Sequence, residues 1–232
     1  MDHCLFCHQL IHTDISWRNL FVADSSIPLC AACQARLEII GESICRQCGR
    51  KTEQQTRCPD CENWQTTEPY AGLLQMNRSL FTYNSFMQEV MTKWKYRGDY
   101  ILKQLFTPYI NKRFPTLFPI TDYTIVPVPL TQARFEERAF NQSQEIARMI
   151  ANKNKKPIVP ALSRYEQRSE KQSKRTKTER MATANPFFFK KMVETDVLLV
   201  DDIYTTGMTL HHAAAELKKA GVKQVYSFTL IR

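Results

Sequence analysis

All eight cysteines of this 232-residue chain lie within its first 61 residues, and every one belongs to a Cys-x-x-Cys pair. A two-residue gap lets two thiolates converge on one tetrahedral metal ion, and two such pairs complete a Cys4 zinc site. Eight ligands therefore predict two zinc ions, both structural because four thiolates leave no open position for a substrate. We expect a zinc-binding module over residues 1–66 and a second domain over residues 67–232. The pairs are Cys4 and Cys7, Cys30 and Cys33, Cys45 and Cys48, and Cys58 and Cys61.

The spacing leaves open how the four pairs combine. Joining consecutive pairs needs only local loops of modest closure entropy, and a cross-braced arrangement is the alternative. Disulfides are a weaker interpretation, because we expect a cytoplasmic protein whose thiols stay reduced. That expectation rests on two observations. No apolar run approaches the roughly 20 residues of a membrane span, and the sequence begins without the basic and apolar segments of a secretory signal.

The chain is basic, with 32 Lys and Arg residues against 23 Asp and Glu residues and a formal net charge of +9. This balance favours polyanionic partners such as nucleic acid, an acidic membrane surface or phosphorylated ligands, although a solvated basic face is the simpler interpretation. The polar segment 163–185 has no apolar periodicity and predicts a mobile loop or arm. Its candidates for contact with nucleic-acid phosphates are Lys171, Lys174, Arg175, Lys177 and Arg180.

Aromatic residues near the cysteine pairs have two interpretations. Trp17, Phe21 and Trp64 either form the small core of the zinc module, which we favour, or contact nucleic acid together with the basic residues around them. Those basic residues are Arg36, Arg46, Arg50, Lys51 and Arg57.

Beyond residue 66, stretches with strand character alternate with stretches of helical periodicity. The segment 196–200 is the most hydrophobic of the strands, as expected for one buried on both faces. The alternation predicts a parallel α/β sheet. The predicted strands lie at 70–83, 123–130, 157–162, 187–189, 196–200 and 222–230. The predicted helices lie at 86–97, 100–113, 142–152 and 207–220.

Two acids, three threonines and a glycine follow this buried strand within nine residues, 201–209. In a parallel sheet they lie at the carboxyl end of a strand, where ligands bind. Backbone amides at the start of the next helix, together with hydroxyls and a glycine, form a cradle for an anion. The paired carboxylates suit a ligand that carries both a phosphate and a ribose diol, with a divalent cation to neutralise the remaining charge. A simple helix cap is the alternative interpretation.

The pattern DDxxTTGxT after a strand is similar to the ribose-phosphate motif of type I phosphoribosyltransferases. With the cysteine-rich head, the VPVPL segment at 126–130 and the RAFNQ segment at 138–142, it makes the chain resemble the ComF family over nearly its whole length. The resemblance implies a phosphoribosyltransferase-like α/β domain with a zinc-binding head. It also implies a cytoplasmic role in natural transformation, with single-stranded DNA and a DNA-translocating ATPase (a ComFA-type helicase) as partners. Peripheral association with the membrane uptake machinery is compatible with this role.

The same resemblance assigns roles to individual residues. Asp201 and Asp202 match the family's ribose-binding acids, and the RAFNQ segment follows the strand at which such folds bind pyrophosphate. Ala139 departs from the family, which usually has glycine there, and its β-carbon disfavours a left-handed backbone. The phosphate cradle comprises Thr205, Thr206, Gly207, Met208 and Thr209. The pyrophosphate and loop candidates are Lys95, which begins a KYxGD segment with Gly98 and Asp99, and Arg138, Asn141 and Gln142.

Three functions are compatible with these features. The first, which we favour, is a DNA-uptake factor that binds single-stranded DNA and a phosphoribosyl pyrophosphate-type ligand, together with Mg²⁺. The second is a working phosphoribosyltransferase, in which the loop at 164–180 would exclude water during transfer to an unidentified acceptor. The third is an adaptor whose zinc module docks the translocating ATPase, and it is compatible with the first.

Overall fold

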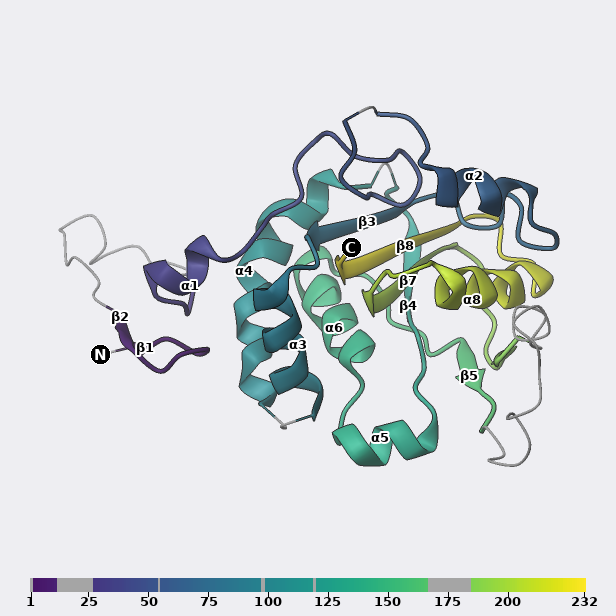
Figure 1. Ribbon diagram of the computed structural model, residues 1–232. Coiled ribbons are helices and arrows are strands. Elements are labelled where there is room, and N and C mark those ends of the chain that lie inside the picture. The colour runs from purple at the N-terminus through teal and green to yellow at the C-terminus, as the bar shows by residue number, and fades with distance from the viewer. Residues whose placement is uncertain (1, 12–26, 54, 97–98, 119, 167–184) are drawn as a thin grey trace, which may run out of the picture.

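The computed structural model describes the whole chain except residues 1, 12–26, 54, 97–98, 119 and 167–184. At its centre lies a sheet of four strands in the order β3-β8-β7-β4 (Figure 1). Each neighbouring pair is parallel, which confirms the predicted parallel α/β architecture. The strands are β3 (Asn77–Phe81), β8 (Val225–Ile231), β7 (Asp196–Ile203) and β4 (Tyr123–Pro127).

Helices cover both faces of the sheet, and β7 contributes side chains to the core on each face (Figure 1). Leu198 and Val200 belong to one core, whereas Val197 and Leu199 belong to the other. This division follows because successive side chains of a strand point to opposite faces. The first core includes residues of α3 (Ser85–Tyr96), α4 (Lys103–Arg113) and α6 (Gln142–Asn154), and the second includes residues of α8 (Met208–Lys219).

The cysteine-rich head packs along the sheet rather than standing apart from it. The ring of Phe6 contacts the ring of Phe86 in α3, with 4.7 Å between centroids. The backbone amide of Ile40 donates to the carbonyl of Leu80 in β3 over 2.9 Å, so the head shields the outer edge of the sheet. The domain boundary proposed at residue 66 stays a prediction. The short elements of the head are β1 (Asp2–His3), β2 (Leu10–Ile11), α1 (Ala31–Ala35) and α2 (Pro59–Thr66).

The strand predicted at 157–162 was placed too early. In this segment only Ile158 bridges to the sheet, at Ile125, and the strand β5 begins at Leu162. Pro157 and Pro160 explain the difference, because proline has no backbone N–H to donate to a ladder. The strand β5 (Leu162–Arg164) pairs antiparallel with β6 (Phe187–Phe189), and these two flank the segment that contains the predicted basic arm.

Beyond residue 66, two other predicted elements differ clearly in their bounds, and one α-helix of the described residues was missed. The strand predicted at 70–83 is shortened to β3, because the chain first turns at Gly72, whose φ is 70°. The helix predicted at 100–113 is a 3₁₀ turn, η1 (Tyr100–Leu102), followed by α4, and a second such turn, η2 (Phe114–Thr116), follows α4. Helix α5 (Gln132–Arg138) was not predicted, because it exposes all of its residues except Arg138 and has no apolar periodicity.

Candidate functional site

The eight cysteines form two compact clusters, each built from consecutive pairs. Within each cluster the Sγ atoms all lie within 4.8 Å of one another, and all eight thiols are free of disulfides. The Sγ atoms of Cys7 and Cys30 are 3.6 Å apart, and those of Cys48 and Cys58 are 3.7 Å apart. Tetrahedral zinc with bonds of about 2.3 Å places its sulfurs about 3.8 Å apart. Both donor sets therefore fit zinc. The cross-braced alternative is excluded, because one cluster holds residues 4, 7, 30 and 33 and the other holds 45, 48, 58 and 61.

Within the second cluster, the surroundings of Cys48 favour its thiolate form. A hydrogen bond from Cys61 and the nearby guanidinium of Arg232 lower the pKa of the Cys48 thiol to about 4, although burial opposes them. Arg232 Nη2 donates to Cys48 Sγ over 3.4 Å. Since the thiolate is the form that binds metal, both contacts favour the ligand state of Cys48.

The predicted phosphate loop joins β7 to α8. Gly207 is the N-cap of α8 and has a φ of 85°, a left-handed conformation that glycine adopts readily. It packs so closely on Tyr204 that a β-carbon there would lie 2.3 Å from the tyrosine hydroxyl. Among the described residues, no side chain or backbone group accepts from the amides of Thr205, Thr206 or Gly207. The loop thus offers unpaired donors at a helix N-terminus, as an anion cradle requires.

The two acids that precede the loop are held differently. Asp201 Oδ1 accepts from Ser143 Oγ and from the backbone amide of Asp202, both over 2.9 Å. Asp202 Oδ2 forms an ion pair of 2.5 Å with Lys95 Nζ, and only 14% of each side chain is exposed. Ser143 lies on α6 and Lys95 on α3, so two helices converge on the carboxyl end of β7.

A pocket of about 220 Å³ opens at these acids, and four cationic side chains contribute to its lining. Lys95, Arg134, Arg138 and Arg164 line it together with Asp201 and Asp202. Burial, and then the neighbouring charge of Arg134, lower the pKa of Arg164, whereas the charge of Asp201 opposes them. Three buried polar atoms of lining residues have no partner in the described chain, namely Arg138 Nε, Gln142 Nε2 and Arg164 Nε. An anionic ligand would satisfy these donors.

The pocket brings together part of the sequence candidates: Asp201 and Asp202 line it, whereas Thr206, Gly207 and Met208 of the phosphate loop do not. Lys95, Arg138 and Gln142 line the pocket with Thr205 and Thr209. Asn141 does not line it, because its side chain caps α6 at the Ser143 amide and donates to the carbonyl of Val128. Asp99 is exposed and also lies outside the lining. The candidates that fall outside the described residues are Gly98, Lys171, Lys174, Arg175, Lys177 and Arg180.

Sequence reasoning missed several residues of this site. Ser143 directly follows the RAFNQ segment, which was the available signal for it. Arg164 was counted as the start of the basic arm, yet it lies on β5 and lines the pocket. Trp64 was assigned to a small core within the zinc module, but it stacks on His211 of α8, with 3.9 Å between ring centroids. No pattern in the sequence marked Arg134 or Arg232.

Ala139, at the position where the resemblance implies glycine, occupies a left-handed turn. Ala139 is the C-cap of α5, with φ of 62° and ψ of −9°. The turn therefore keeps its glycine-like geometry, and alanine bears a cost of about 1 kcal/mol for it. Its backbone amide donates to the carbonyl of Phe135 over 2.8 Å, so the geometry of the segment is intact.

Comparison with known proteins gives matches to both parts of the chain. A family described as "Phosphoribosyl transferase domain" matches residues 136–232, and one described as "Double zinc ribbon domain" matches residues 2–62. The competence protein ComFC of Bacillus subtilis (strain 168) is 37% identical over 232 residues, which cover 99% of this chain and 94% of that protein. This chain belongs to the ComFC family.

Other relatives support the ComFC assignment. ComFC of Streptococcus pneumoniae (strain ATCC BAA-255 / R6) is 33% identical, and the match covers 99% of both proteins. Competence protein F of Haemophilus influenzae (strain ATCC 51907 / DSM 11121 / KW20 / Rd) is 26% identical over 92% of this chain and 93% of its own. The chain thus combines a double zinc ribbon with a phosphoribosyltransferase fold. Within the described residues, no helix is long and apolar enough to cross a membrane.

Asp201 of this ComFC-family protein makes stability depend on pH. Burial, and then the charge of Asp202, raise the pKa of Asp201 to about 7. Between about pH 4 and pH 7 the folded state keeps a proton that the unfolded state has lost, so the free energy of unfolding falls as pH rises. We expect Asp201→Asn to be more stable than the wild type at pH 8, by on the order of 2 kcal/mol, and nearly equal to it at pH 4. Urea unfolding at both pH values measures this, and an equal difference at the two values would contradict it.

Proposed function

We propose that this protein binds a phosphoribosyl pyrophosphate-type ligand with Mg²⁺ at the carboxyl end of β7, and that it serves DNA uptake in natural transformation. The observation that carries the ligand proposal is the pocket lined by Asp201 and Asp202 together with four cationic side chains, whose lining residues include three unpartnered buried donors. A ligand that is anionic at both ends and carries a diol between them matches this distribution of groups.

Each part of such a ligand has a matching set of protein groups. The unpaired amides from Thr205 to Gly207 suit a terminal phosphate at the start of α8. The carboxylates of Asp201 and Asp202 suit the ribose hydroxyls, which donate hydrogen bonds. The guanidinium groups of Arg134, Arg138 and Arg164 suit the pyrophosphate. Mg²⁺ bound with the ligand would offset the charge of the two acids.

Calorimetric titration with 5-phosphoribosyl pyrophosphate and Mg²⁺ tests the ligand proposal. We expect saturable binding to the wild type and a loss of at least about 30-fold in affinity for Asp201→Asn/Asp202→Asn, because two hydrogen-bonding carboxylates are removed. Asp196→Asn is the matched control, since Asp196 lies at the opposite end of the same strand. Equal affinity of the double variant and the wild type would overturn the assignment of these acids.

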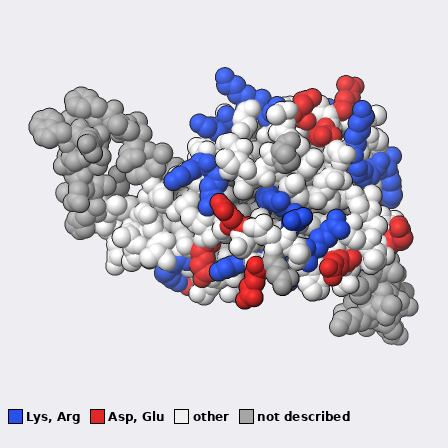
Figure 2. Space-filling model, turned by 90° about the horizontal axis from the view of Figure 1, so that it is seen from above, with Lys and Arg blue, Asp and Glu red and all other residues white. Residues whose placement is uncertain are grey.

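The proposed role in DNA uptake rests on the net charge of the chain and on the names of its relatives. The relatives are named competence proteins, and the chain carries a formal net charge of +9. On the face shown in Figure 2, basic and acidic side chains are interspersed, and the basic ones form no continuous track. We therefore keep the basic segment 164–180 as the DNA candidate, although residues 167–184 of it lie outside the described chain. We further propose a cytoplasmic location, peripheral association with the membrane uptake machinery and a zinc head that docks the DNA-translocating ATPase.

Binding of labelled single-stranded DNA to the purified protein tests the DNA-uptake proposal. Binding is expected to weaken with salt, with a log–log slope of about −0.7 for each phosphate that the protein neutralises. Five Lys and Arg residues lie in the candidate segment from Lys171 to Arg180, and their replacement by Gln should make that slope markedly shallower. Binding that does not change with salt, or no binding at low salt, would remove single-stranded DNA from the proposal.

Catalysis of phosphoribosyl transfer is the second candidate function, and the cationic side chains that line the pocket favour it. Arg134, Arg138 and Arg164 could stabilise a departing pyrophosphate as well as a bound one. Release of pyrophosphate in the presence of a panel of bases and nucleotides distinguishes the two. Release that exceeds the rate of Asp201→Asn/Asp202→Asn shows turnover, whereas equal rates leave the protein as a binder.

A further inference from the structure

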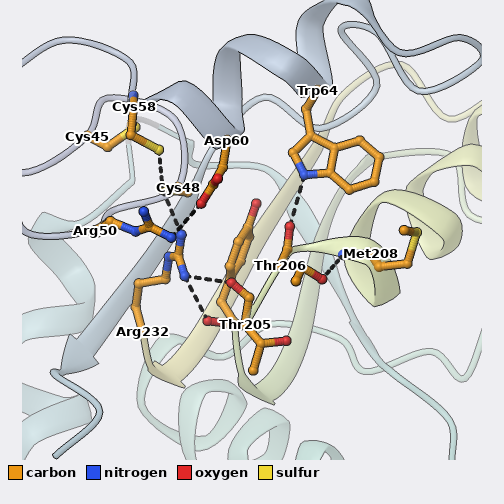
Figure 3. Close-up of polar contacts among 11 residues, drawn as sticks. Cys45, Cys48, Arg50, Cys58, Asp60, Trp64, Thr205, Thr206, Met208 and Arg232 are labelled. Atoms are coloured by element: carbon orange, nitrogen blue, oxygen red, sulfur yellow. Dashed lines mark hydrogen bonds and ion pairs between the residues drawn. The ribbon is translucent and has the colours of Figure 1, made fainter. Parts of the chain in front are cut away.

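The second cysteine cluster reaches the phosphate loop through two side chains (Figure 3). Trp64 Nε1 donates to the carbonyl of Thr206 over 2.9 Å. Arg232 Nη1 donates to the carbonyls of Thr205 and Tyr204, over 2.7 Å and 3.2 Å. Three consecutive carbonyls of the loop thus accept from donors that lie on the side of the zinc head.

Both donors are tied to the cluster itself. Trp64 lies on α2, which starts directly after Cys58 and contains Cys61. Arg232 Nη2 contacts Cys48 Sγ over 3.4 Å, and its guanidinium lies over the ring of Tyr204, 4.5 Å from the centroid. The indole of Trp64 is also stacked on His211 of α8, with an angle of 10° between the rings. Metal at this cluster would therefore fix the helix that carries Trp64 and the sulfur that the Arg232 side chain contacts.

The contacts with the carbonyls also set the direction of the amides. A peptide unit is planar and trans, so its N–H points away from its C=O. The carbonyls of Tyr204, Thr205 and Thr206 share peptide units with the amides of Thr205, Thr206 and Gly207. Donors that hold these carbonyls toward the zinc head consequently turn the three amides toward the opposite side. These three amides donate to no acceptor in the described chain.

We propose that Trp64 and Arg232 are positioning residues of the phosphate loop, and that the metal state of the second cysteine cluster controls the loop through them. Metal-bound cysteines hold α2 and Arg232 in place, and the loop amides then point toward the ligand. Loss of that metal releases both donors, so the amides reorient and the affinity for ligand falls. The statement about affinity rests on the function proposed above, whereas the statement about loop conformation does not.

The first cluster provides an internal comparison, because it packs elsewhere. Its segment contacts α3, where Lys93 Nζ donates to the carbonyl of Phe6 over 3.0 Å. Within the described part of the head, neither this segment nor the cysteines of the first cluster contact the phosphate loop. Changes at the first cluster therefore have no direct contact through which to alter the phosphate loop.

The test compares full-length zinc-loaded variants by hydrogen exchange and by calorimetry. Trp64→Phe keeps an aromatic ring on His211 but removes the N–H donor, and Arg232→Gln removes the guanidinium. Lys93→Gln is the matched control, because it removes a side-chain contact with a backbone carbonyl near the first cluster. Exchange is read from peptides that contain the amides of residues 205–207, and binding is measured with 5-phosphoribosyl pyrophosphate and Mg²⁺. Cys48→Ser and Cys7→Ser, with zinc content measured, compare the two clusters.

We expect exchange at residues 205–207 to be about 5-fold faster in Trp64→Phe and about 10-fold faster in Arg232→Gln, with ligand affinity reduced by similar factors. Lys93→Gln should leave both readouts at the wild-type level, and Cys7→Ser should raise exchange at residues 205–207 less than Cys48→Ser does. Unchanged exchange in both Trp64→Phe and Arg232→Gln would overturn the proposal, even if Cys48→Ser fails to fold. If the wild type does not bind the ligand, the proposed function fails, while the exchange data still decide the control of the loop.

Discussion

Replacement of Gly207 by alanine is expected to reduce the affinity for 5-phosphoribosyl pyrophosphate by at least about 100-fold. Two costs combine at this position. A β-carbon at a φ of 85° costs about 1–2 kcal/mol, and here it would also lie 2.3 Å from the hydroxyl of Tyr204. Tyr204 has no room to move, because only 3% of it is exposed and Arg232 lies over its ring. The loop must therefore shift, and the shift displaces the amides that form the cradle.

A substitution at Gly221 separates the cost of the left-handed backbone from the cost of the close contact. Its φ is 91°, but a β-carbon there meets no atom within 4 Å, and it follows α8 at the end opposite the loop. Gly221→Ala should lose about 1–2 kcal/mol of stability and keep the affinity of the wild type. Urea unfolding and calorimetric titration of both variants give the comparison. If Gly207→Ala binds as tightly as Gly221→Ala, the close contact with Tyr204 does not shape the cradle.

Removal of zinc is expected to destabilise the whole fold and not only the head. Cysteines of both clusters lie in the two main cores: Cys33 belongs to the core that includes residues of α3, and Cys61 belongs to the core that includes residues of α8. Structural zinc commonly supplies 10 kcal/mol or more of folding free energy in small domains. A loss of even about 5 kcal/mol lowers the Tm of a chain of this size by about 10–20 °C. We expect a chelator to produce at least this change, and added zinc to reverse it.

Single cysteine substitutions should show which of the two clusters contributes more to thermal stability. Only 1% of Cys61 is exposed, whereas Cys7 is partly exposed. Cys61→Ser should therefore lower the Tm more than Cys7→Ser, since it leaves a polar group in a buried cluster. Elemental analysis should give two zinc ions per wild-type chain and one per variant. Fewer than two ions in the wild type, or a Tm that does not respond to the chelator, would contradict two structural sites.

Features with local signals were predictable from the sequence. The spacing within each Cys-x-x-Cys pair predicts that its two thiolates bind one metal ion. The structure confirms the favoured consecutive pairing. The phosphate loop is one continuous segment after a strand of four apolar residues, and the structure places it between β7 and α8. The parallel sheet followed from the alternation of strands and helices, because such connections are the usual origin of parallel pairing.

The partners of the site residues could not be predicted, because tertiary packing joins distant segments. Ser143 and Asp201 are 58 positions apart, and Trp64 and Thr206 are 142 positions apart. No local pattern encodes such a pair. Arg232 contacts the loop because β8 and β7 are neighbours that end at the same edge of the sheet. The left-handed turn at Ala139 was also hidden, since alanine disfavours the conformation that it adopts there.

The most direct measurement is a crystal structure of the zinc-loaded protein with 5-phosphoribosyl pyrophosphate and Mg²⁺. We expect the terminal phosphate at the amides of residues 205–207, the ribose hydroxyls at Asp201 and Asp202, and the pyrophosphate among Arg134, Arg138 and Arg164. Trp64 and Arg232 should still hold the loop carbonyls in that complex. A ligand bound elsewhere on the fold, or one in this pocket that does not contact the two acids, would contradict the central claim.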